Sequence, residues 1–394
     1  MKLGIFRRPF TKLHEIVRIF SNWTDWLAWT ILDFSKFKNI KTKNIKKILI
    51  VLVNGMEGNI GGNFCTLGVV NYFKKLHPEI ELFLLSDNKS INQFGYNPGI
   101  KFIEYAGQNT IEELKKENID AMIAMDFGPK LNVRDLFFIP YRIARSSSDF
   151  RGLFKLRNKL GFTRRVFIPW GMHMVDARFK LFEKLGFSIP KKGLKLFFSK
   201  KEEETVDKFL RKNKINKFIV LHPGGKHMVD TIKRKKCAPH LWSFEKYAKV
   251  ADHFSEKGYN VLVTGAPNES LLFEKINEKA NSQLINCCGQ FNVKESAALL
   301  KKAKLLIATD TSIVHLAYQI NVPIVELMGP SYPLIVGAWP LNDKKHKILF
   351  DNGRCAYSMR KIECPENKPC MENIKVKQVI RNMEGLLKNV KEKK

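Results

Sequence analysis

LLIATDTSIVHLAYQINVPIVELM (residues 305–328) contains two short apolar runs separated by a stretch with helical spacing. The runs at 305–309 and 323–328 are typical of strands that are buried on both faces, and 312–319 between them predicts a helix. A strand, a helix and another strand in succession favour a parallel pair joined by a crossover helix. This stretch therefore indicates an α/β fold.

The rest of the chain continues this alternation in two series, separated by the Lys- and Glu-rich segment 199–216. We therefore predict two Rossmann-like, doubly wound parallel-sheet domains that face each other across a ligand cleft. The predicted strands are 48–53, 81–86, 101–105, 121–125, 218–222, 260–264, 283–286, 305–309 and 323–328, and the predicted helices are 66–76, 110–117, 243–256, 269–279, 293–301 and 312–319.

The chain is strongly basic, with 68 Lys and Arg residues against 38 Asp and Glu residues and a formal charge of +30 over 394 residues. Such a charge favours a partner of opposite sign, such as a phosphate-rich lipid, an anionic membrane or nucleic acid. The lysines are nevertheless spread along the whole chain, and a solvated lysine-rich surface explains them equally well. Charge alone therefore selects no partner.

Seven cysteines, an odd number, show no regular paired framework. This argues against a secreted disulfide scaffold and favours a reducing cytoplasm. Cys355, Cys364 and Cys370 gather near the C-terminus but lack the C-x-x-C pairs typical of structural zinc. We therefore predict no metal site.

The N-terminal extension is basic and aromatic. No apolar run in the sequence approaches the roughly 18–20 residues that cross a bilayer, and Met1–Arg8 leads into no signal-peptide core. Residues 10–38 combine Phe and Trp with basic side chains at an irregular helical period. They predict either a helix in a membrane interface or a helix packed on the first domain.

Polar and glycine residues follow four predicted strands of the second domain. Because carboxyl ends of parallel strands share one edge of a sheet, we expect these loops to form one rim. Glycines allow close approach to the backbone, lysines neutralise phosphate, and a helix N-terminus favours a diphosphate. Each loop alone has an ordinary explanation as a turn or a cap, but four together favour a nucleotide diphosphate pocket. The segments are Pro223–Lys226 with the basic run 233–236, Gly265–Glu269, Asp310–His315 and Gly329–Ser331.

Several motifs have a recognisable order. They are LHPGGK (221–226), VLVTGAPNE (261–269), ATDTSIVHLAYQINVPIVELMGPSYP (308–333) and CMENIKVKQVI (370–380), preceded by KILIVLV (47–53), IDAMIAMDFGPK (119–130) and HMVDARF (173–179). Together they resemble glycosyltransferase family 9, the ADP-heptose:lipopolysaccharide heptosyltransferases. The resemblance implies a GT-B fold of two Rossmann-like domains, with an acceptor-binding first domain and a donor-binding second domain. The expected parts are the extension 1–45, the acceptor domain 46–200, the nucleotide-sugar domain 201–345 and a cysteine-containing segment with a helix at 346–394.

The resemblance also implies donor contacts. The segment Asp310–Ser312 and His315 are expected to meet the diphosphate and sugar, with Lys226 or a lysine among 233–236 assisting and Glu269 on the nucleoside. Relatives often have glycine where Ser312 stands, and a serine still offers its backbone N–H. The expected donor-binding residues are Gly224, Gly225, Lys226, Lys236, Gly265, Glu269, Asp310, Thr311, Ser312 and His315.

The catalytic base departs from the family pattern. Relatives place an aspartate in the first glycine-rich loop, where this chain has Gly61, Gly62 and Asn63, none of which accepts a proton. Glu57 is the only carboxylate of that loop, and we name it as the candidate base.

The resemblance implies an inverting transfer of a sugar, with heptose from ADP-heptose the expected donor and a lipopolysaccharide core or related lipid-linked glycan the acceptor. The sequence contains no D-x-D element, so we expect no metal ion and no cofactor beyond the nucleotide sugar. The expected location is cytoplasmic, on an anionic inner-membrane surface, and nucleic acid is not an expected partner.

Three alternatives remain open at this point. A degenerate relative would bind a nucleotide sugar or glycolipid without transfer, since the aspartate is missing. A dinucleotide-binding dehydrogenase would explain the first glycine-rich loop, but Gly55, Gly58 and Gly61 do not form G-x-G-x-x-G. Nucleic-acid binding rests on charge alone.

Overall fold

The computed structural model describes residues 44–53, 60–87, 97–127, 131–146, 162–169, 171–191, 193–194, 196, 198–234, 240–351 and 371–391. These residues fall into two compact units. Unit 1 is drawn from Met1–Gly58, Phe73–Lys89 and Pro98–Lys191, and unit 2 from Asn59–Tyr72, Ser90–Asn97 and Lys192–Lys394.

Unit 1 contains a six-stranded parallel sheet with the order β3-β2-β1-β4-β5-β6. Its central strand β1 (Lys47–Val53) lies between β2 and β4, so that Ile48 pairs with Leu82 on one side and with Ala121 on the other. The other elements are β2 (Glu81–Ser86), β3 (Ile100–Glu104), α3 (Gln108–Lys116), β4 (Ala121–Phe127), the 3₁₀ turn η4 (Val133–Leu136), β5 (Tyr141–Ser146), β6 (Arg164–Phe167) and α5 (Met174–Lys184).

Unit 2 contains a second six-stranded parallel sheet with the order β12-β11-β10-β7-β8-β9. Counted from β7, this is the order of unit 1 and the 3-2-1-4-5-6 order of a Rossmann sheet. Its strands are β7 (Phe218–His222), β8 (Asn260–Val263), β9 (Ile285–Asn286), β10 (Leu306–Thr309), β11 (Ile324–Met328) and β12 (His346–Phe350). Its helices are α6 (Lys200–Lys212), α7 (Lys226–Lys233), α8 (Phe244–Glu256), the 3₁₀ turn η5 (Pro267–Glu269), α9 (Ser270–Asn277), α10 (Val293–Lys302), α11 (Ser312–Gln319), α12 (Pro333–Val336) and α13 (Val376–Lys391).

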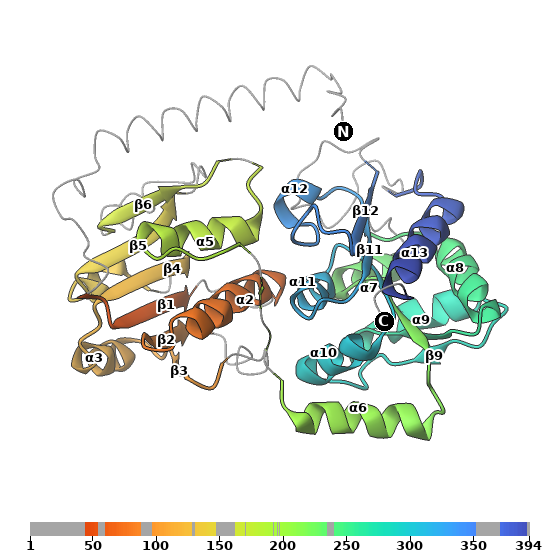
Figure 1. Cartoon of the computed structure of the whole chain (residues 1–394), viewed down its shortest axis with the longest axis horizontal. Helices are drawn as coiled ribbons and strands as arrows, with labels where there is room; N and C mark the ends of the chain where they lie inside the picture. The colour runs from red at the N-terminus through yellow and green to blue at the C-terminus, as the bar shows by residue number, and fades with distance from the viewer. Residues whose placement is uncertain are drawn as a thin grey trace, which may run out of the picture. The chain divides into compact units, whose positions relative to one another are not determined.

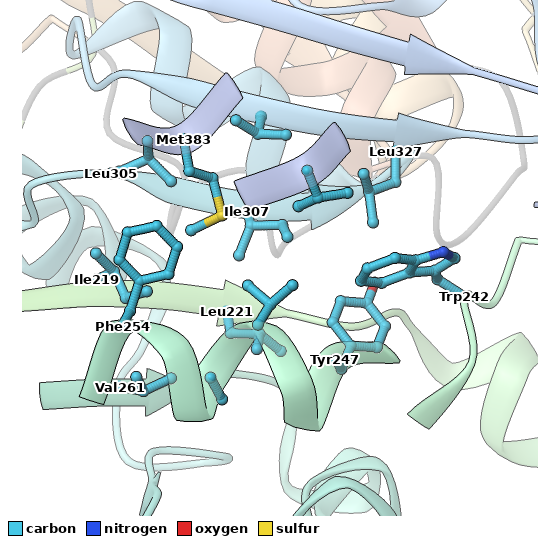
Figure 2. Close-up of a cluster of buried hydrophobic side chains, with 14 of the residues drawn as sticks. Ile219, Leu221, Trp242, Tyr247, Phe254, Val261, Leu305, Ile307, Leu327 and Met383 are labelled. Carbon is cyan, nitrogen blue, oxygen red and sulfur yellow. The ribbon is translucent and has the colours of Figure 1, made fainter. Parts of the chain in front are cut away.

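The sheet of unit 2 is covered on both faces, with α11 on one side and α8 and α13 on the other (Figure 1). Figure 2 shows the core beneath α8 and α13, where Phe254 and Met383 meet side chains of the sheet such as Ile307. Trp242 closes one end of this core, and its indole N–H donates to the carbonyl of Ile374 at 3.1 Å. Burial of this apolar surface is the main stabilising contribution to the unit.

The two predicted parallel sheets are confirmed, and every predicted strand is present with its ends shifted by at most two residues. Three strands escaped prediction: β5 (YRIARS), β6 (RRVF) and β12 (HKILF) contain arginine or lysine, so none is a continuous apolar run. The segment 199–216, taken as a separator, contains α6, which begins with a capping box between Ser199 and Glu202.

The predicted start of the first helix near Thr66 is wrong. Helix α2 spans Ile60–Leu76, so Gly61, Gly62 and Asn63 lie in its first turns and not in an acceptor-side loop. Glycines are poor helix formers, which is why the sequence favoured a loop. In unit 2, a Cβ atom at Gly61 would stand 2.8 Å from Cδ2 of His315, and the amide of Gln319 donates to the carbonyl of Phe64 at 2.9 Å. Tertiary packing therefore overrides the low helical propensity.

Among the described residues, no helix combines the length and the apolar character needed to span a membrane. Residues 10–38, for which a membrane-interface helix was one prediction, lie outside the described residues.

Candidate functional site

The switch point of the unit 2 sheet lies between β7 and β10, which are adjacent and parallel. From β7 the chain builds outward through β8 and β9, and from β10 it builds in the opposite direction through β11 and β12. Ligands of open α/β sheets bind outside the carboxyl ends of the strands at such a point. The expectation that the loops after β7, β8, β10 and β11 share one edge is confirmed, because all four strands run parallel in this sheet.

Two helices begin at this point. Helix α7 follows β7 with Gly225 as its N-cap residue, and α11 follows β10 with Thr311 as its N-cap residue. Gly225 has no side chain to cap α7, the Thr311 side chain does not cap α11, and neither helix has an acidic residue in its first turn. The Thr311 hydroxyl instead donates back to the carbonyl of Thr309 at 3.2 Å. Helix N-termini of this kind favour an anion through their backbone N–H groups and dipole.

Side-chain hydrogen bonds tie the strand ends together. The Thr309 hydroxyl at the end of β10 donates to the carbonyl of Pro223 after β7 at 3.3 Å. Nδ1 of His222 lies 3.0 Å from Oγ1 of Thr264 after β8. Desolvation lowers the pKa of His222 to about 4, so the ring is neutral at physiological pH. Three neighbouring loops are therefore held by neutral polar contacts.

Glu269 occupies the loop after β8 and is buried. Its Oε2 accepts from the backbone N–H of Ala266 at 2.8 Å, so one function of the carboxylate is to hold its own turn. A Cβ atom on Gly265 would stand 3.0 Å from Cβ and from Oε2 of Glu269 and 3.1 Å from the Cys288 sulfur. A Cβ atom on Gly225 would lie 3.8 Å from Oε1. The absence of a side chain at Gly265 is thus required by close packing on Glu269.

His315 lies one helical turn into α11 and is 5% exposed. Burial by itself lowers its pKa, but the Cys65 sulfur, Asp310 and Glu326 outweigh burial and raise the pKa to about 9. The ring is therefore positively charged at neutral pH. Cys65 also lies 3.1 Å from the Tyr318 hydroxyl, so His315 is surrounded by polar groups of unit 2. A charged imidazolium beside a helix N-terminus strengthens the attraction for a diphosphate.

Most of the predicted donor residues lie in the described part of the chain. Gly224 and Gly225 lie at the end of β7, Gly265 and Glu269 follow β8, and Asp310–Ser312 and His315 lie at the start of α11. The backbone of Lys226 begins α7, but its side chain lies outside the described part of the chain. Lys236 and the candidate base Glu57 also lie outside it. The structure thus brings eight of the ten predicted donor residues to the ends of β7, β8 and β10.

Several polar residues of this edge were not predicted. His222 and Thr309 were regarded only as the last residues of their strands, although a polar side chain at a strand end is itself a signal. Glu326 was hidden inside PIVELM, where a single carboxylate interrupts an otherwise apolar strand. Charged residues are almost never fully buried without a partner, so this interruption was the available sign.

Among the described residues, no group of three or more His, Cys, Asp or Glu side chains is arranged to hold a metal ion.

Comparisons with known proteins agree with this architecture. The chain is 23% identical over 345 residues to a lipopolysaccharide core heptosyltransferase of Haemophilus influenzae, and the match covers 82% of this chain and 94% of that protein. A solved glycosyltransferase family 9 structure from Veillonella parvula superposes with a TM-score of 0.70 at 20% identity, covering 89% of this chain and 99% of the other. A solved E. coli heptosyltransferase with ADP gives a TM-score of 0.60 at 17% identity, covering 86% and 99% of the two chains.

The structural likenesses show that the GT-B fold of these transferases is shared. The sequence model of glycosyltransferase family 9 (heptosyltransferase) matches residues 151–369, which is more than half of the chain and includes the whole edge from β7 to β11. The rim of loops, the two helix N-termini and this match lead to one conclusion: the chain belongs to glycosyltransferase family 9, the heptosyltransferases, and is a glycosyltransferase.

Proposed function

We propose that this protein is an inverting, metal-independent glycosyltransferase that moves heptose from ADP-heptose to a lipopolysaccharide core or a related lipid-linked glycan. The observation that carries the proposal is the pair of helix N-termini, α7 and α11, which meet the sheet edge at its switch point without side-chain caps. ADP in the related E. coli structure and the lipopolysaccharide core named for the Haemophilus relative support the choice of donor and acceptor.

In the proposed site the diphosphate lies against the N-termini of α7 and α11. Asp310, Thr311, Ser312 and His315 contact the diphosphate and the sugar, and Gly224 and Gly225 let the backbone approach them. The imidazolium of His315 and the helix dipoles stabilise the negative charge that develops on the leaving diphosphate, which is where a transferase gains most of its rate. These groups perform the task that a divalent cation performs in other transferases.

Displacement with inversion also requires a base for the acceptor hydroxyl. Glu57 is the proposed base. Residues Gly61, Gly62 and Asn63, inside α2, offer no carboxylate where relatives have aspartate. The acceptor is lipid-linked, so the proposed location is the cytoplasmic face of the inner membrane, with the basic N-terminal extension on anionic lipid.

The donor is tested by calorimetry on the full chain. ADP should bind, and UDP and GDP should bind more weakly. Asp310→Ala should raise the dissociation constant for ADP-heptose at least about tenfold, because the change removes a polar group from the start of α11. Asp252→Asn changes a carboxylate that accepts hydrogen bonds from Asn281 and Ser282. This variant is the control and should bind ADP-heptose with the wild-type dissociation constant. An unchanged constant for Asp310→Ala contradicts the donor site.

Transfer itself is tested with the same protein. Wild-type enzyme should transfer heptose in excess chelator, and Glu57→Gln should abolish transfer while ADP binding is retained. Transfer that stops on chelation rejects the metal-independent mechanism, and Glu57→Gln with normal turnover rejects Glu57 as the base. Wild-type protein that binds ADP-heptose but transfers nothing to any lipopolysaccharide acceptor supports the degenerate, binding-only alternative.

A further inference from the structure

Glu326 is an acidic side chain in the interior of a sheet. It lies in the middle of β11, opposite Ala308 of β10 and Ile348 of β12, and its exposure is 0%. Its strand neighbours Val325 and Leu327 belong to the apolar core shared with α8 and α13. Since side chains alternate along a strand, Glu326 belongs to the opposite face, the one covered by α11.

The hydrogen bonds of this carboxyl are incomplete. Its Oε2 accepts from the backbone N–H of Ala338 at 2.7 Å, which ties the chain after α12 to the sheet. Its Oε1 is buried and has no hydrogen-bond partner among the described residues. An ionised carboxylate with one unsatisfied oxygen is costly to bury, whereas a protonated carboxyl is much less so.

The titratable groups that act on Glu326 belong to the donor site. Asp310, at the end of β10, disfavours its ionised form, and His315, on α11, favours it. Burial and Asp310 together raise the pKa of Glu326 to about 8. His315 in turn is influenced by Cys65 of α2 and by Asp310. Nδ1 of His315 is also buried without a partner in the described part of the chain.

We propose that Glu326 is a positioning residue of the donor site that takes up a proton from solvent when a nucleotide diphosphate binds at the N-terminus of α11. The inference rests on the proposed donor site. A bound diphosphate adds negative charge close to Asp310 and His315, and at a pH above about 8, where the buried carboxyl of Glu326 is partly ionised, the carboxyl responds by becoming neutral. The neutral carboxyl still accepts the hydrogen bond from Ala338, and it carries no negative charge that would repel the diphosphate.

The direction of the effect follows from linkage. An added anion raises the proton affinity of a nearby acid, so the bound complex holds more protons than the free protein over the pH range around the free pKa. If the ligand raises the pKa of Glu326 by about one unit, the uptake is about half a proton at pH 8.5 and about a tenth of a proton at pH 7. The terminal phosphate of ADP titrates near pH 6, so ADP is almost fully ionised at pH 8.5 and contributes no protons there. At pH 7 about a tenth of it is still protonated, so a release of up to about a tenth of a proton from ADP offsets the small uptake by Glu326.

The experiment is titration calorimetry of the full chain with ADP in buffers of different ionisation enthalpy, which gives the number of protons exchanged on binding. We expect uptake in the wild type at pH 8.5 that largely disappears at pH 7. Binding without uptake at pH 8.5 overturns the inference and leaves the donor site intact. No ADP binding at all overturns the proposed donor, and this inference with it.

Two substitutions distinguish the titration of Glu326 from its hydrogen bond to Ala338. Glu326→Gln keeps the length of the side chain and an acceptor for Ala338, but cannot titrate, and should lose the uptake at pH 8.5. Glu326→Asp keeps a titratable carboxyl on the same face of β11, one methylene closer to the backbone, and should retain the proton uptake. Asp252→Asn is the control and should match the wild type. Uptake that persists in Glu326→Gln assigns the proton to another group, such as His315, and rejects the inference. If Glu326→Gln does not fold, the pH profile of wild-type uptake decides: uptake by Glu326 is greatest at about pH 8.5, and uptake that is instead greatest about one pH unit higher belongs to His315, whose pKa is higher, and rejects the inference.

Discussion

His222 is a partly buried and Glu326 a fully buried ionisable residue of the same sheet, and desolvation keeps both neutral by opposite routes. Desolvation lowers the pKa of the imidazole of His222 and raises the pKa of the carboxyl of Glu326. His315 differs from both, because the Cys65 sulfur and Asp310 raise its pKa despite burial. Among the described residues of this edge, His315 is thus charged and Glu326 is neutral, an arrangement that suits the proposed diphosphate.

The lowered pKa of His222 predicts that the protein loses stability in acid. Its folded pKa of about 4 lies below the ordinary value of 6.5, so the unfolded chain binds the proton first as the pH falls. Stability from this residue is present above pH 6.5 and is lost between pH 6.5 and pH 4, and about 2 kcal/mol should be lost by pH 5. His222→Asn, which keeps a polar side chain toward Thr264, should remove this part of the pH dependence.

The measurement is urea unfolding of both proteins at pH 7.5 and pH 5. The wild type should lose more unfolding free energy than His222→Asn over this interval, even if the variant is less stable at both values. Equal losses contradict a buried neutral imidazole at this position.

At the residue scale, the sequence pointed to the residues at the strand ends better than to the groups that support them. Gly225, Glu269 and Asp310 were found because strand ends and glycines have recognisable patterns. His222 and Glu326 were not, because their effects depend on desolvation and on neighbours such as Thr264 and Ala338 that are distant in sequence. Glu57 and Lys236 remain predictions from the sequence.

Elements were predicted where a strand is a continuous apolar run, as in β1 and β10. They were missed where lysine or arginine interrupts the pattern, as in β5, β6 and β12, because an edge or near-edge strand tolerates charged side chains at its exposed positions. The start of α2 was misplaced for a different reason. Gly61 and Gly68 lower helical propensity, yet Cβ atoms there would crowd His315 and Gln319, so close packing with α11 selects glycine within a helix.

The loop between β8 and α9 provides an element-scale prediction. Gly265→Ala would bring a Cβ atom within 3.0 Å of Glu269 and 3.1 Å of the Cys288 sulfur, so the turn must shift. We expect a loss of about 1–3 kcal/mol in stability from overpacking, and weaker ADP binding as Glu269 moves.

Gly385→Ala in α13 is the matched control, since nothing lies within 4 Å of a Cβ atom there. An alanine in a helix interior should stabilise the protein by about 0.5–1 kcal/mol. Thermal unfolding and ADP calorimetry of both variants give the comparison. Two variants with the same melting temperature and the same affinity show that Gly265 is not packed as described.

At the scale of the whole molecule, the fold consists of two sheets with the same strand order. The net charge of +30 is the reason to expect an anionic membrane as a partner. Deletion of residues 10–38 should release the protein from vesicles that contain anionic lipid, because this segment combines aromatic and basic side chains. Cosedimentation at low and at physiological salt measures the effect. Binding of the full chain should weaken as salt rises, and a deleted form that sediments equally refutes the assignment.

The last described helix, α13, has a consequence for biogenesis. Val379, Met383 and Leu386 are part of the same buried cluster as Ile219 of β7 and Ile307 of β10. A ribosome that has translated every proposed donor-binding residue through His315 has therefore not yet supplied α13, which completes this cluster. Apolar surface of the nascent unit 2 therefore stays uncovered until residues 376–391 emerge from the exit tunnel, and chaperone capture of stalled chains should end at that point.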